Sequence, residues 1–194
     1  YSLSGAGSEN FSVDSAGNIS LVNTLDYETA TSYTLTLNAS DGVNTTSSDL
    51  IITVDDVNEA PSLSNTLAAS SFAENISTGT TIATASASDP ESQTITYALS
   101  GSGSENFAVD SSGNVTLIAG LDYETASSYT LTLSASDGVN TITNTIAISI
   151  SDVNEAPSLS SSLAASSFAE NTAAGTTIAT ASASDPESQT ITYA

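Results

Sequence analysis

The chain repeats itself at a spacing of 96 residues, and this repeat restricts its possible folds more than any other feature. The hexapeptide Asp-Val-Asn-Glu-Ala-Pro occurs at 56–61 and again at 152–157, and most other segments recur at the same offset. A fixed period of this kind is typical of an array of similar structural units, each contacting mainly its neighbours. The 194 residues correspond to two repeat lengths and two further residues.

Within one repeat, apolar and polar residues alternate with a period of two, and the alternation stops at Gly, Asn, Asp and Pro. Short antiparallel strands joined by turns show this pattern. It predicts strands at 62–70, 80–86, 93–99, 106–109, 114–118, 128–135 and 141–150. Seven strands at such intervals favour a β-sandwich.

Alternate positions of these strands are apolar and are expected to face the core. The inward-facing sets are Ile95, Tyr97 and Leu99, then Tyr129, Leu131 and Leu133, then Ile146, Ile148 and Ile150. Phe72 and its counterpart Phe168 are also expected in cores. Asp14 and Asp110 precede Gly-containing turns and are predicted to stabilise those turns.

The chain has no Lys, Arg or His, so no side chain carries a positive charge. With 22 acidic residues, its formal net charge is −22. Two carboxylates about 4 Å apart repel by about 4 kcal/mol at an effective dielectric constant near 20. Acids held together in a fold therefore need a bound cation. Carboxylate and carbonyl oxygens suit calcium, whereas the lack of imidazole and thiol disfavours zinc, copper and iron–sulfur sites.

Composition excludes several functional classes. A charge of −22 argues against binding to nucleic acid or to anionic membranes. No apolar run approaches the roughly 20 residues that a membrane-spanning helix needs, so no membrane insertion is expected. Only 11% of the residues are charged and 39% are hydrophobic, which favours a folded chain over a disordered acidic one.

Five short motifs carry a resemblance to a known family. They are Asp-x-Asn-acid-x-Pro at 56–61 and 152–157, Leu-Asp-x-Glu at 25–28 and 121–124, Phe-x-Glu-Asn at 72–75 and 168–171, Asp-x-acid at 89–91 and 185–187, and Ala-Ser-Asp-Gly at 135–138. Together they resemble the calcium motifs of cadherin-type repeats, specifically the bacterial cadherin-like kind.

The resemblance implies an all-β chain of seven-stranded Greek-key sandwiches of cadherin or immunoglobulin-like type, arranged end to end. It implies a partial domain at 1–60 that lacks its first two strands, a complete domain at 61–156 and the start of a third domain at 157–194. Both ends fall at the same point of the repeat, so the sequence is expected to be a window of a longer chain.

In that family, calcium lies between consecutive domains, and the ligands carry over motif by motif. For the junction before the complete domain, the resemblance assigns Asp26, Glu28, Asp56, Asn58, Glu59, Asp89, Glu91 and Asp137. For the junction after it, the resemblance assigns Glu74, Asp122, Glu124, Asp152, Asn154, Glu155, Asp185 and Glu187. Asp41 and Glu170 are expected to serve junctions with further domains.

The motifs depart from the family pattern at Ala60 and Ala156, where a second Asn is usual, and at Glu91 and Glu187, where the family has Asp. Two or three calcium ions per junction are therefore expected. Tyr27 and Tyr123 lie inside the acidic motif and are predicted to pack over the site.

No catalytic constellation is present, since the chain has no His, Lys or Cys to act as base or nucleophile. Paired acids could serve a glycosidase, but pairs that recur in every repeat fit metal sites better. The sequence thus predicts a non-enzymatic, calcium-rigidified spacer of an extracellular adhesin or filament, for example in a bacterial biofilm matrix. Its expected partners are neighbouring repeats, with homophilic bundling of filaments as a further possibility.

Two alternatives remain open. The first is a recognition module that binds a partner homophilically or through a glycan, although near-identical repeats offer no distinctive patch. The second is self-assembly, in which residues 157–194 of one molecule supply the missing first strands to residues 1–60 of another.

Overall fold

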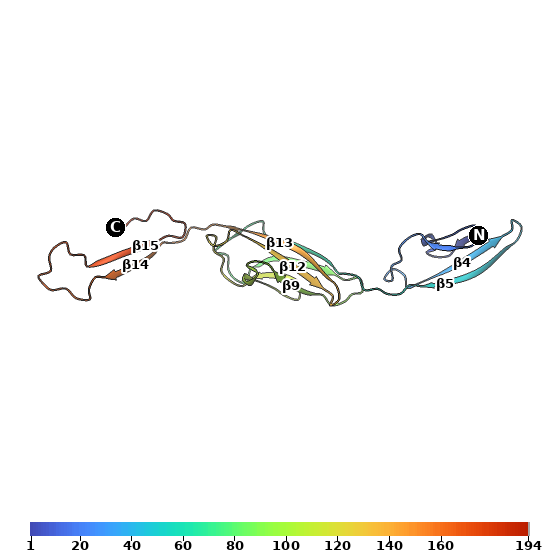
Figure 1. The fold of residues 1–194 in the computed structure, drawn as a ribbon, viewed down its shortest axis with the longest axis horizontal. Helices are drawn as coiled ribbons and strands as arrows, with labels where there is room; N and C mark the ends of the chain where they lie inside the picture. Colours follow the sequence, from blue (N-terminus) through green and yellow to red (C-terminus); the bar gives the residue numbers. More distant parts are fainter. Residues whose placement is uncertain (194) are drawn as a thin grey trace. The chain divides into compact units, whose positions relative to one another are not determined.

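The computed structural model describes residues 1–193, which are almost entirely β-strand and turn (Figure 1). The chain divides into two compact units. The first comprises Tyr1–Ser62, Ala87–Thr96 and Ser136–Ile142, and the second comprises Leu63–Ser86, Tyr97–Ala135 and the described residues from Thr143 onward. The described residues contain no helix of a length and hydropathy suited to crossing a membrane.

Residues 62–151 form two four-stranded sheets, which is the β-sandwich predicted from the sequence. One sheet has the order β10-β11-β8-β6 and the other has the order β7-β13-β12-β9. Their bounds are β6 Ser62–Leu67, β7 Phe72–Ala73, β8 Thr81–Ser88, β9 Thr96–Ser100, β10 Phe107–Val109, β11 Asn114–Leu117, β12 Ser128–Ser136 and β13 Thr141–Ser151. A short 3₁₀ helix, η2, spans Ser104–Asn106.

All seven predicted strands are present, with ends shifted by a few residues. The sequence did not reveal β7, which has only two residues and pairs in parallel with the end of β13, Phe72 opposite Ile150. Two residues are too few to display an alternating pattern. The strand β7 is therefore defined by its pairing with β13 and not by a pattern in its own sequence.

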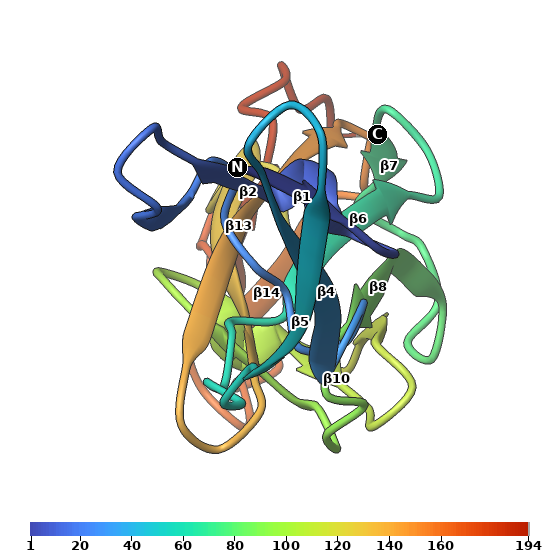
Figure 2. The ribbon, with the colours of Figure 1, turned by 90° about the vertical axis from the view of Figure 1, so that its right-hand side faces the viewer.

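Residues 1–60 contain five strands that correspond one by one to β9–β13. They are β1 Ser2–Ser4, β2 Phe11–Val13, β3 Ile19–Leu21, β4 Ser32–Ser40 and β5 Thr45–Thr53, with the 3₁₀ helix η1 at Ser8–Asn10. They form the sheets β1-β4-β5 and β2-β3. The long β4–β5 hairpin is paired over nine residues, from Ser32 opposite Thr53 to Ser40 opposite Thr45 (Figure 2).

Residues 158–184 contain two strands, β14 Ser158–Leu163 and β15 Ala179–Ser184, which correspond to β6 and β8. They pair antiparallel along their full length, from Ser158 opposite Ser184 to Leu163 opposite Ala179. No second sheet covers them within residues 157–193.

The core of the second unit lies between the two sheets of the sandwich. Leu131, Leu133 and Ile146 have no exposed surface, and Tyr97 and Leu99 pack against this core from its edge. Eight of the nine predicted inward-facing residues of the central repeat are thus confirmed as core or core-packing residues. Ile95 is the exception, because it precedes β9 and is only half-buried. Phe72 is buried at 6% exposure, but the prediction that Phe168 is also a core residue was wrong, because Phe168 is 42% exposed. Residues 157–193 lack the opposing sheet that would cover it.

A tight contact recurs at each 3₁₀ helix. Gly103 has φ of 80°, and a Cβ at this position would lie 2.4 Å from the Tyr129 ring. The Tyr129 ring packs edge-on against Phe107, with the centroids 5.4 Å apart. The same contact joins Gly7 and Tyr33 in the first unit, so the repeat in sequence is also a repeat in local packing.

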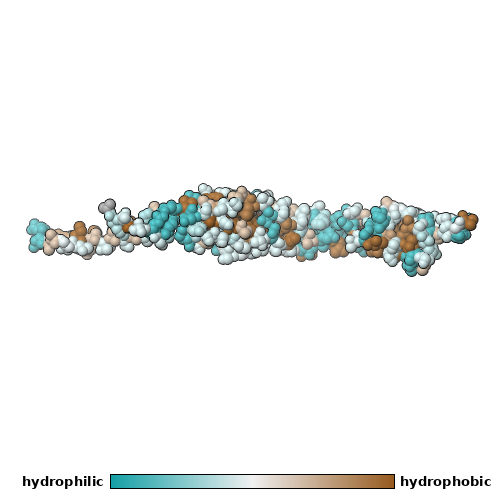
Figure 3. Space-filling view, turned by 90° about the horizontal axis from the view of Figure 1, so that it is seen from above, coloured by the Kyte–Doolittle hydropathy of each residue, from teal (hydrophilic) through white to brown (hydrophobic). Residues whose placement is uncertain are grey.

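Much of the molecular surface is pale in the hydropathy view, because Ser and Thr occupy many of the exposed positions (Figure 3). The strongly hydrophilic residues are few, in keeping with a charged fraction of 11%.

Leu117 and Leu21 occupy equivalent positions but differ in burial, at 0% and 61% exposure. We expect Leu117→Ala to lower the free energy of unfolding by about 2–5 kcal/mol, because it leaves a cavity in a packed core. The matched variant Leu21→Ala should change stability by about 0.5 kcal/mol or less in dilute protein. Urea denaturation of both variants measures the difference, and equal losses would contradict the described core.

Candidate metal centres

Eight predicted ligands come together in the first unit, and we call them the first site. Asp26 and Glu28 lie between β3 and β4, and the others lie in the segment after β5, in the turn after β8 and in the turn between β12 and β13. The full set is Asp26, Glu28, Asp56, Asn58, Glu59, Asp89, Glu91 and Asp137, all within the ranges of the first unit.

Three glutamates form the centre of the first site. Carboxylate oxygens of Glu28, Glu59 and Glu91 lie within 4.8 Å of one another. An open cavity of about 440 Å³ adjoins them, lined by Tyr27, Glu28, Thr31, Asp56, Pro90 and Glu91. Tyr27 thus lies at the edge of this cavity, next to the acids it was predicted to cover.

Asn58 connects the two turns of the first site. Its Nδ2 donates to Asp137 Oδ2 at 2.9 Å, and its backbone carbonyl accepts from Asn140 Nδ2 at 3.3 Å. Its side-chain oxygen accepts from Gln93 Nε2. Sequence reasoning missed both Gln93 and Asn140. The available signal was that Gln93 follows the Asp-x-acid motif in both repeats, since Gln189 makes the same bond to Asn154.

The other eight predicted ligands come together in the second unit and form the second site. They are Glu74, Asp122, Glu124, Asp152, Asn154, Glu155, Asp185 and Glu187, all within the ranges of that unit. Two triads of carboxylates lie within 4.8 Å: Glu74 with Asp122 and Glu124, and Glu124 with Asp152 and Glu187. Glu124 belongs to both triads, so it can bridge two positions for cations.

Glu74 is the one charged side chain that is buried in the described part of the chain, at 4% exposure. Its Oε2 accepts from Tyr123 N and its Oε1 accepts from Val153 N, each at 2.6 Å. Its backbone N donates to Ser151 O at 3.1 Å. Glu74 therefore links β7, the segment before β12 and the segment after β13 at a single point.

The aspartates at the edges of both sites are held by local backbone bonds. Asp122 Oδ1 accepts from Thr125 N at 2.9 Å, and Asp26 accepts in the same way from Thr29 N. Asp89 accepts from Gln93 N at 3.0 Å; Asp185 accepts from Gln189 N. The bonds to Asp26, above all from Thr29, lower its pKa. These local hydrogen bonds orient the carboxylates.

Glu155 and Glu187 form a close pair in the second site. The backbone N of Glu155 donates to Glu187 Oε1 at 2.7 Å. A side-chain hydrogen bond with Glu187 raises the pKa of Glu155 to about 7, with burial and the charges of Glu74 and Glu124 acting in the same direction. The pKa of Glu187 is lowered, chiefly by the bond from the Glu155 backbone. A hydrogen bond between the two side chains needs a proton on Glu155, so it is absent when both carboxylates are ionised.

Two more glutamates, Glu59 and Glu124, also have raised pKa values. A side-chain hydrogen bond with Glu91 raises the pKa of Glu59, and burial and the charges of Glu91, Glu28 and Asp26 add to it. Burial raises the pKa of Glu124, with added repulsion from Glu74 and Asp152. Both sites hold more negative charge than their surroundings offset.

Unpartnered oxygens provide a direct test of whether a cation fits. With the carboxylates ionised, four buried oxygens of the two sites accept no hydrogen bond: Asp89 Oδ2, Glu91 Oε2, Glu155 Oε2 and Glu187 Oε2. A buried acceptor without a partner costs about 1–3 kcal/mol, and more when it is charged. No Lys, Arg or His exists to pair with them. An all-oxygen set of this kind fits a hard divalent cation such as calcium.

Four acids outside the two sites, Asp14, Asp41, Asp49 and Asp110, accept hydrogen bonds from nearby residues. Asp14 and Asp110 stabilise turns as predicted: Asp110 Oδ1 accepts from Ser112 N at 2.9 Å and from Asn114 N at 2.8 Å. Asp49 accepts from Thr36 Oγ1 at 3.0 Å on the β4–β5 hairpin.

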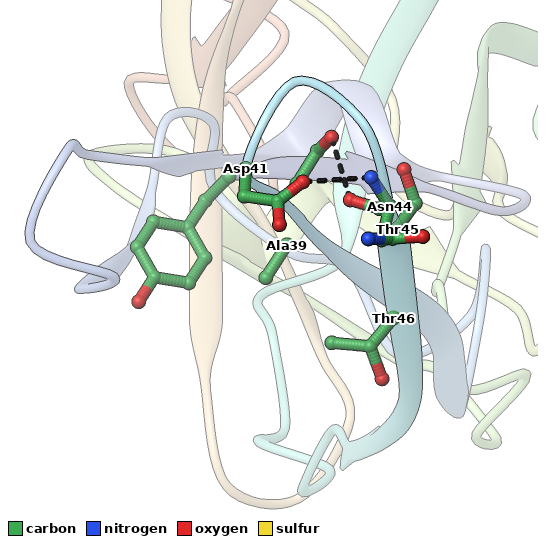
Figure 4. Close-up of a pocket in the computed structure, with 7 residues that line it drawn as sticks. Ala39, Asp41, Asn44, Thr45 and Thr46 are labelled. Atoms are coloured by element: carbon green, nitrogen blue, oxygen red, sulfur yellow. Dashed lines mark hydrogen bonds between the residues drawn. The ribbon is translucent and has the colours of Figure 1, made fainter.

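Asp41 lies at the tip of the β4–β5 hairpin, beside an open hollow of about 450 Å³ that Tyr1, Ala39 and Thr46 also line (Figure 4). Its Oδ1 accepts from Val43 N and Asn44 N at 2.8 and 2.7 Å. This is the conformation that Asp137 adopts in the first site, where Oδ1 accepts from Val139 N and Asn140 N. The role of Asp41 toward a further domain stays a prediction.

Comparison with known proteins identifies the module. Residues 69–151 match the cadherin domain family. The chain is 34% identical over 187 residues to the protocadherin-like wing polarity protein stan of Drosophila melanogaster. The matched segment covers 88% of this chain and 5% of that protein. It is 32% identical over 197 residues to protocadherin gamma-A2 of Pan troglodytes, covering 95% of this chain and 21% of that protein. It thus spans a small part of these relatives.

Solved structures agree with this assignment. Extracellular cadherin domains 3–6 of protocadherin gamma B2 superpose with a TM-score of 0.62 at 28% identity, covering 95% of this chain and 48% of that one. Domains 3–6 of protocadherin gamma B7, solved as a cis-dimer, superpose with a TM-score of 0.59 at 27% identity.

The matched relatives are animal proteins, so the bacterial surface fibre expected from the motifs has no support among them. The repeat motifs, the two-sheet sandwich and these matches all point to one module. The chain is an extracellular, non-enzymatic segment built of cadherin-domain repeats.

Proposed function

We propose that this chain is a calcium-rigidified structural segment of an extracellular adhesion protein or filament, with domains at 1–60, 61–156 and 157–194. The observation that carries the proposal is the set of four buried, unpartnered carboxylate oxygens in a chain without basic side chains. In this proposal the sixteen residues of the first and second sites hold the ions. The two triads that share Glu124 favour at least two ions in the second site.

Calcium would act by neutralising acids that come from separate parts of the chain. In the first site Glu28 precedes β4, Glu59 follows β5 and Glu91 follows β8, yet their oxygens lie within 4.8 Å. Without a cation these carboxylates repel one another, and the segments that carry them separate. With calcium bound, shared ligands hold the same segments together. Extracellular modules bind calcium with dissociation constants of about 10⁻⁴ to 10⁻³ M, so occupancy follows the extracellular concentration.

The similar proteins indicate the kind of protein to which this segment would belong. Since the matched proteins are animal protocadherins and related cadherins, they support adhesion at a cell surface more directly than a bacterial matrix fibre. Homophilic recognition is the second candidate function, because one of the similar structures is a cis-dimer of protocadherin gamma B7.

Glu124 provides the sharpest test of calcium binding, because it belongs to both triads of the second site. We expect Glu124→Gln to weaken calcium binding at that site by about tenfold or more and to reduce the calcium-induced rise in melting temperature. Each ion should add about 2.7 kcal/mol of stability at 100 times its dissociation constant. Calorimetric titration of chelator-treated protein, with melting followed in parallel, measures both effects.

The matched control is Glu105→Gln, which removes an exposed acid outside both sites and should titrate like the original protein. Small-angle scattering with and without chelator tests the mechanical part of the proposal, since removal of calcium should broaden the distribution of dimensions. Identical scattering in the two conditions, or identical calcium binding in both variants, would refute the proposed role.

Glu74 should be needed for the fold as well as for the ion. Glu74→Ala leaves the backbone N–H groups of Tyr123 and Val153 without their acceptor. We expect a loss of about 2–5 kcal/mol in unfolding free energy at saturating calcium, because each buried unpaired donor costs about 1–3 kcal/mol. Glu170 is the exposed counterpart, and Glu170→Ala should leave the stability of dilute protein unchanged. Chemical denaturation of the two variants side by side checks the contrast.

Calcium-free protein should lose stability as the pH rises from about 4.5 to about 7. The pKa of Glu155 is raised from 4.5 to about 7 in the folded chain, so the folded state binds more protons than the unfolded state in this interval. The stabilisation is complete below the unfolded pKa and is lost as the pH passes the folded one.

Calcium should reverse this trend, since binding requires the ionised carboxylates and releases the proton of Glu155. Melting temperatures across this pH range, with and without calcium, measure the effect. In Glu155→Gln the calcium-free slope between pH 5 and 7 should flatten, and an unchanged slope would assign it to other groups.

A further inference from the structure

Six asparagines of the chain lie in the sequence Asn-x-Ser/Thr, which is the acceptor sequence for N-linked glycans in secreted proteins. Because the chain is an extracellular segment, this modification is open to it. A glycan is bulky and belongs on the surface, so the folded chain tolerates it only where the acceptor nitrogen is exposed and not already engaged. The six asparagines are Asn10, Asn18, Asn38, Asn44, Asn75 and Asn114.

Two of the six are engaged in the turns that contain them. Asn18 Nδ2 donates to Asp14 Oδ2 at 2.7 Å, and Asn114 Nδ2 donates to Asp110 Oδ2 at 2.9 Å. A sugar attached to either nitrogen would compete with the bond that helps to hold the turn. These two positions are therefore poor places for a glycan in the folded chain.

Three more have side chains that contact neighbouring residues. Asn38 lies within β4, and its Nδ2 donates across to β1. Asn10 ends the 3₁₀ helix η1, is half-buried and accepts from Asn23 Nδ2 at 3.2 Å. Asn44 is exposed at the hairpin tip, but its backbone N and, to a smaller extent, its side chain hydrogen-bond to Asp41 and lower the pKa of that carboxyl.

Asn75 differs from the other five, since it is exposed and its side chain makes no hydrogen bond with the described residues. It lies between β7 and β8, in a turn that Ile76 N closes by donating to Ala73 O at 3.0 Å. Ser77 is exposed as well, and a second turn begins there, with Thr80 N donating to Ser77 O at 3.3 Å. The complete acceptor sequence therefore lies in an irregular segment at the surface.

The residues beside Asn75 hold this segment in place. Glu74 is buried at 4% exposure, and Ile76 packs against the core of the sandwich. Since these two side chains are directed inward, Asn75 and Ser77 are left on the solvent side. A sugar on Asn75 would consequently disturb none of the contacts that Glu74 makes.

We propose that Asn75 carries an N-linked oligosaccharide. In the transfer, Asn75 Nδ2 attacks the anomeric carbon of a lipid-linked oligosaccharide diphosphate. A carbon–nitrogen bond forms, and the bond from that carbon to the diphosphate oxygen breaks. The lipid diphosphate leaves with the electron pair, Nδ2 releases one proton, and no atom is oxidised or reduced. The proposal does not depend on the proposed calcium role.

The repeat provides an internal control. Asn171 is exposed in the equivalent turn, which Thr172 N closes by donating to Ala169 O at 3.0 Å. Ala173 stands where the other repeat has Ser77, so Asn171 is not in an acceptor sequence. The substitution Ala173→Ser restores that sequence in the same turn and should make Asn171 a second acceptor.

The site is tested on the chain secreted from cultured animal cells. Peptide-N-glycosidase in heavy-oxygen water converts each glycan-bearing Asn to an Asp that carries the heavy atom. The chain has no Lys or Arg for trypsin, so a glutamate-specific protease is used. Cleavage after Glu74 and Glu91 releases a peptide in which Asn75 is the only asparagine. Mass spectrometry should find the label on Asn75 in most molecules, and incubation without the glycosidase should leave Asn75 unlabelled.

Four variants complete the test. Asn75→Gln and Ser77→Ala should each abolish the label at position 75, whereas Ser77→Thr should retain it. Both side chains are exposed, so these variants should fold, and melting temperatures equal to that of the unaltered chain after glycosidase treatment would verify this. Ala173→Ser should gain a label on Asn171 and the mass of one further glycan.

Several results would overturn the proposal. An unlabelled Asn75 in the secreted chain would refute it directly, and so would a label that persists in Ser77→Ala. Labels on Asn18 or Asn114 as frequent as the label on Asn75 would show that hydrogen-bonded side chains do not select the site. An unlabelled Asn171 in Ala173→Ser would show that the exposed turn is not what makes Asn75 an acceptor.

Discussion

Uncompensated negative charge is the constraint on which the rest of this structure depends. With 22 acids and no basic side chain, the chain cannot form an internal salt bridge between side chains. It nevertheless gathers most of its acids into two sites rather than dispersing them over the surface. Hydrogen bonds from backbone N–H groups orient some of these carboxylates, as in Glu74 and Asp89. The charges themselves remain to be balanced, and this is the role that the proposed calcium ions would have.

The repeat shows how strongly burial depends on neighbours rather than on the residue itself. Leu117 and Leu21 follow almost the same local sequence and lie in equivalent strands, yet one is enclosed and the other exposed. Phe72 and Phe168 differ in the same way. Local features such as the contact between Gly103 and Tyr129 are reproduced in both repeats, because they need only the nearby chain. Features that need a second sheet occur only where that sheet is present.

Much of the fold could be read from the sequence, for physical reasons that particular residues illustrate. The alternation in 141–150 reports one buried face of a strand, and β13 confirms it. The expectation for Phe168 was wrong. Its aromatic side chain indicates a preference for burial, but it does not indicate whether an opposing sheet is present to bury it. The strand β7 was missed because its two residues form no pattern. Gln93 was missed because its bond to Asn58 joins positions 35 residues apart.

The sequence by itself determined the repeat length, the strand pattern and the excess of negative charge, because spacing, alternation and net charge are properties of the residues in order. Only the tertiary structure decided which acids meet. Carboxylate oxygens of Glu28, Glu59 and Glu91 lie within 4.8 Å of one another, although the three residues belong to separate segments of the chain. It also decided that Glu74 is buried and that four carboxylate oxygens are left without donors. Burial and hydrogen bonding depend on the folded surroundings, which a one-dimensional pattern does not contain.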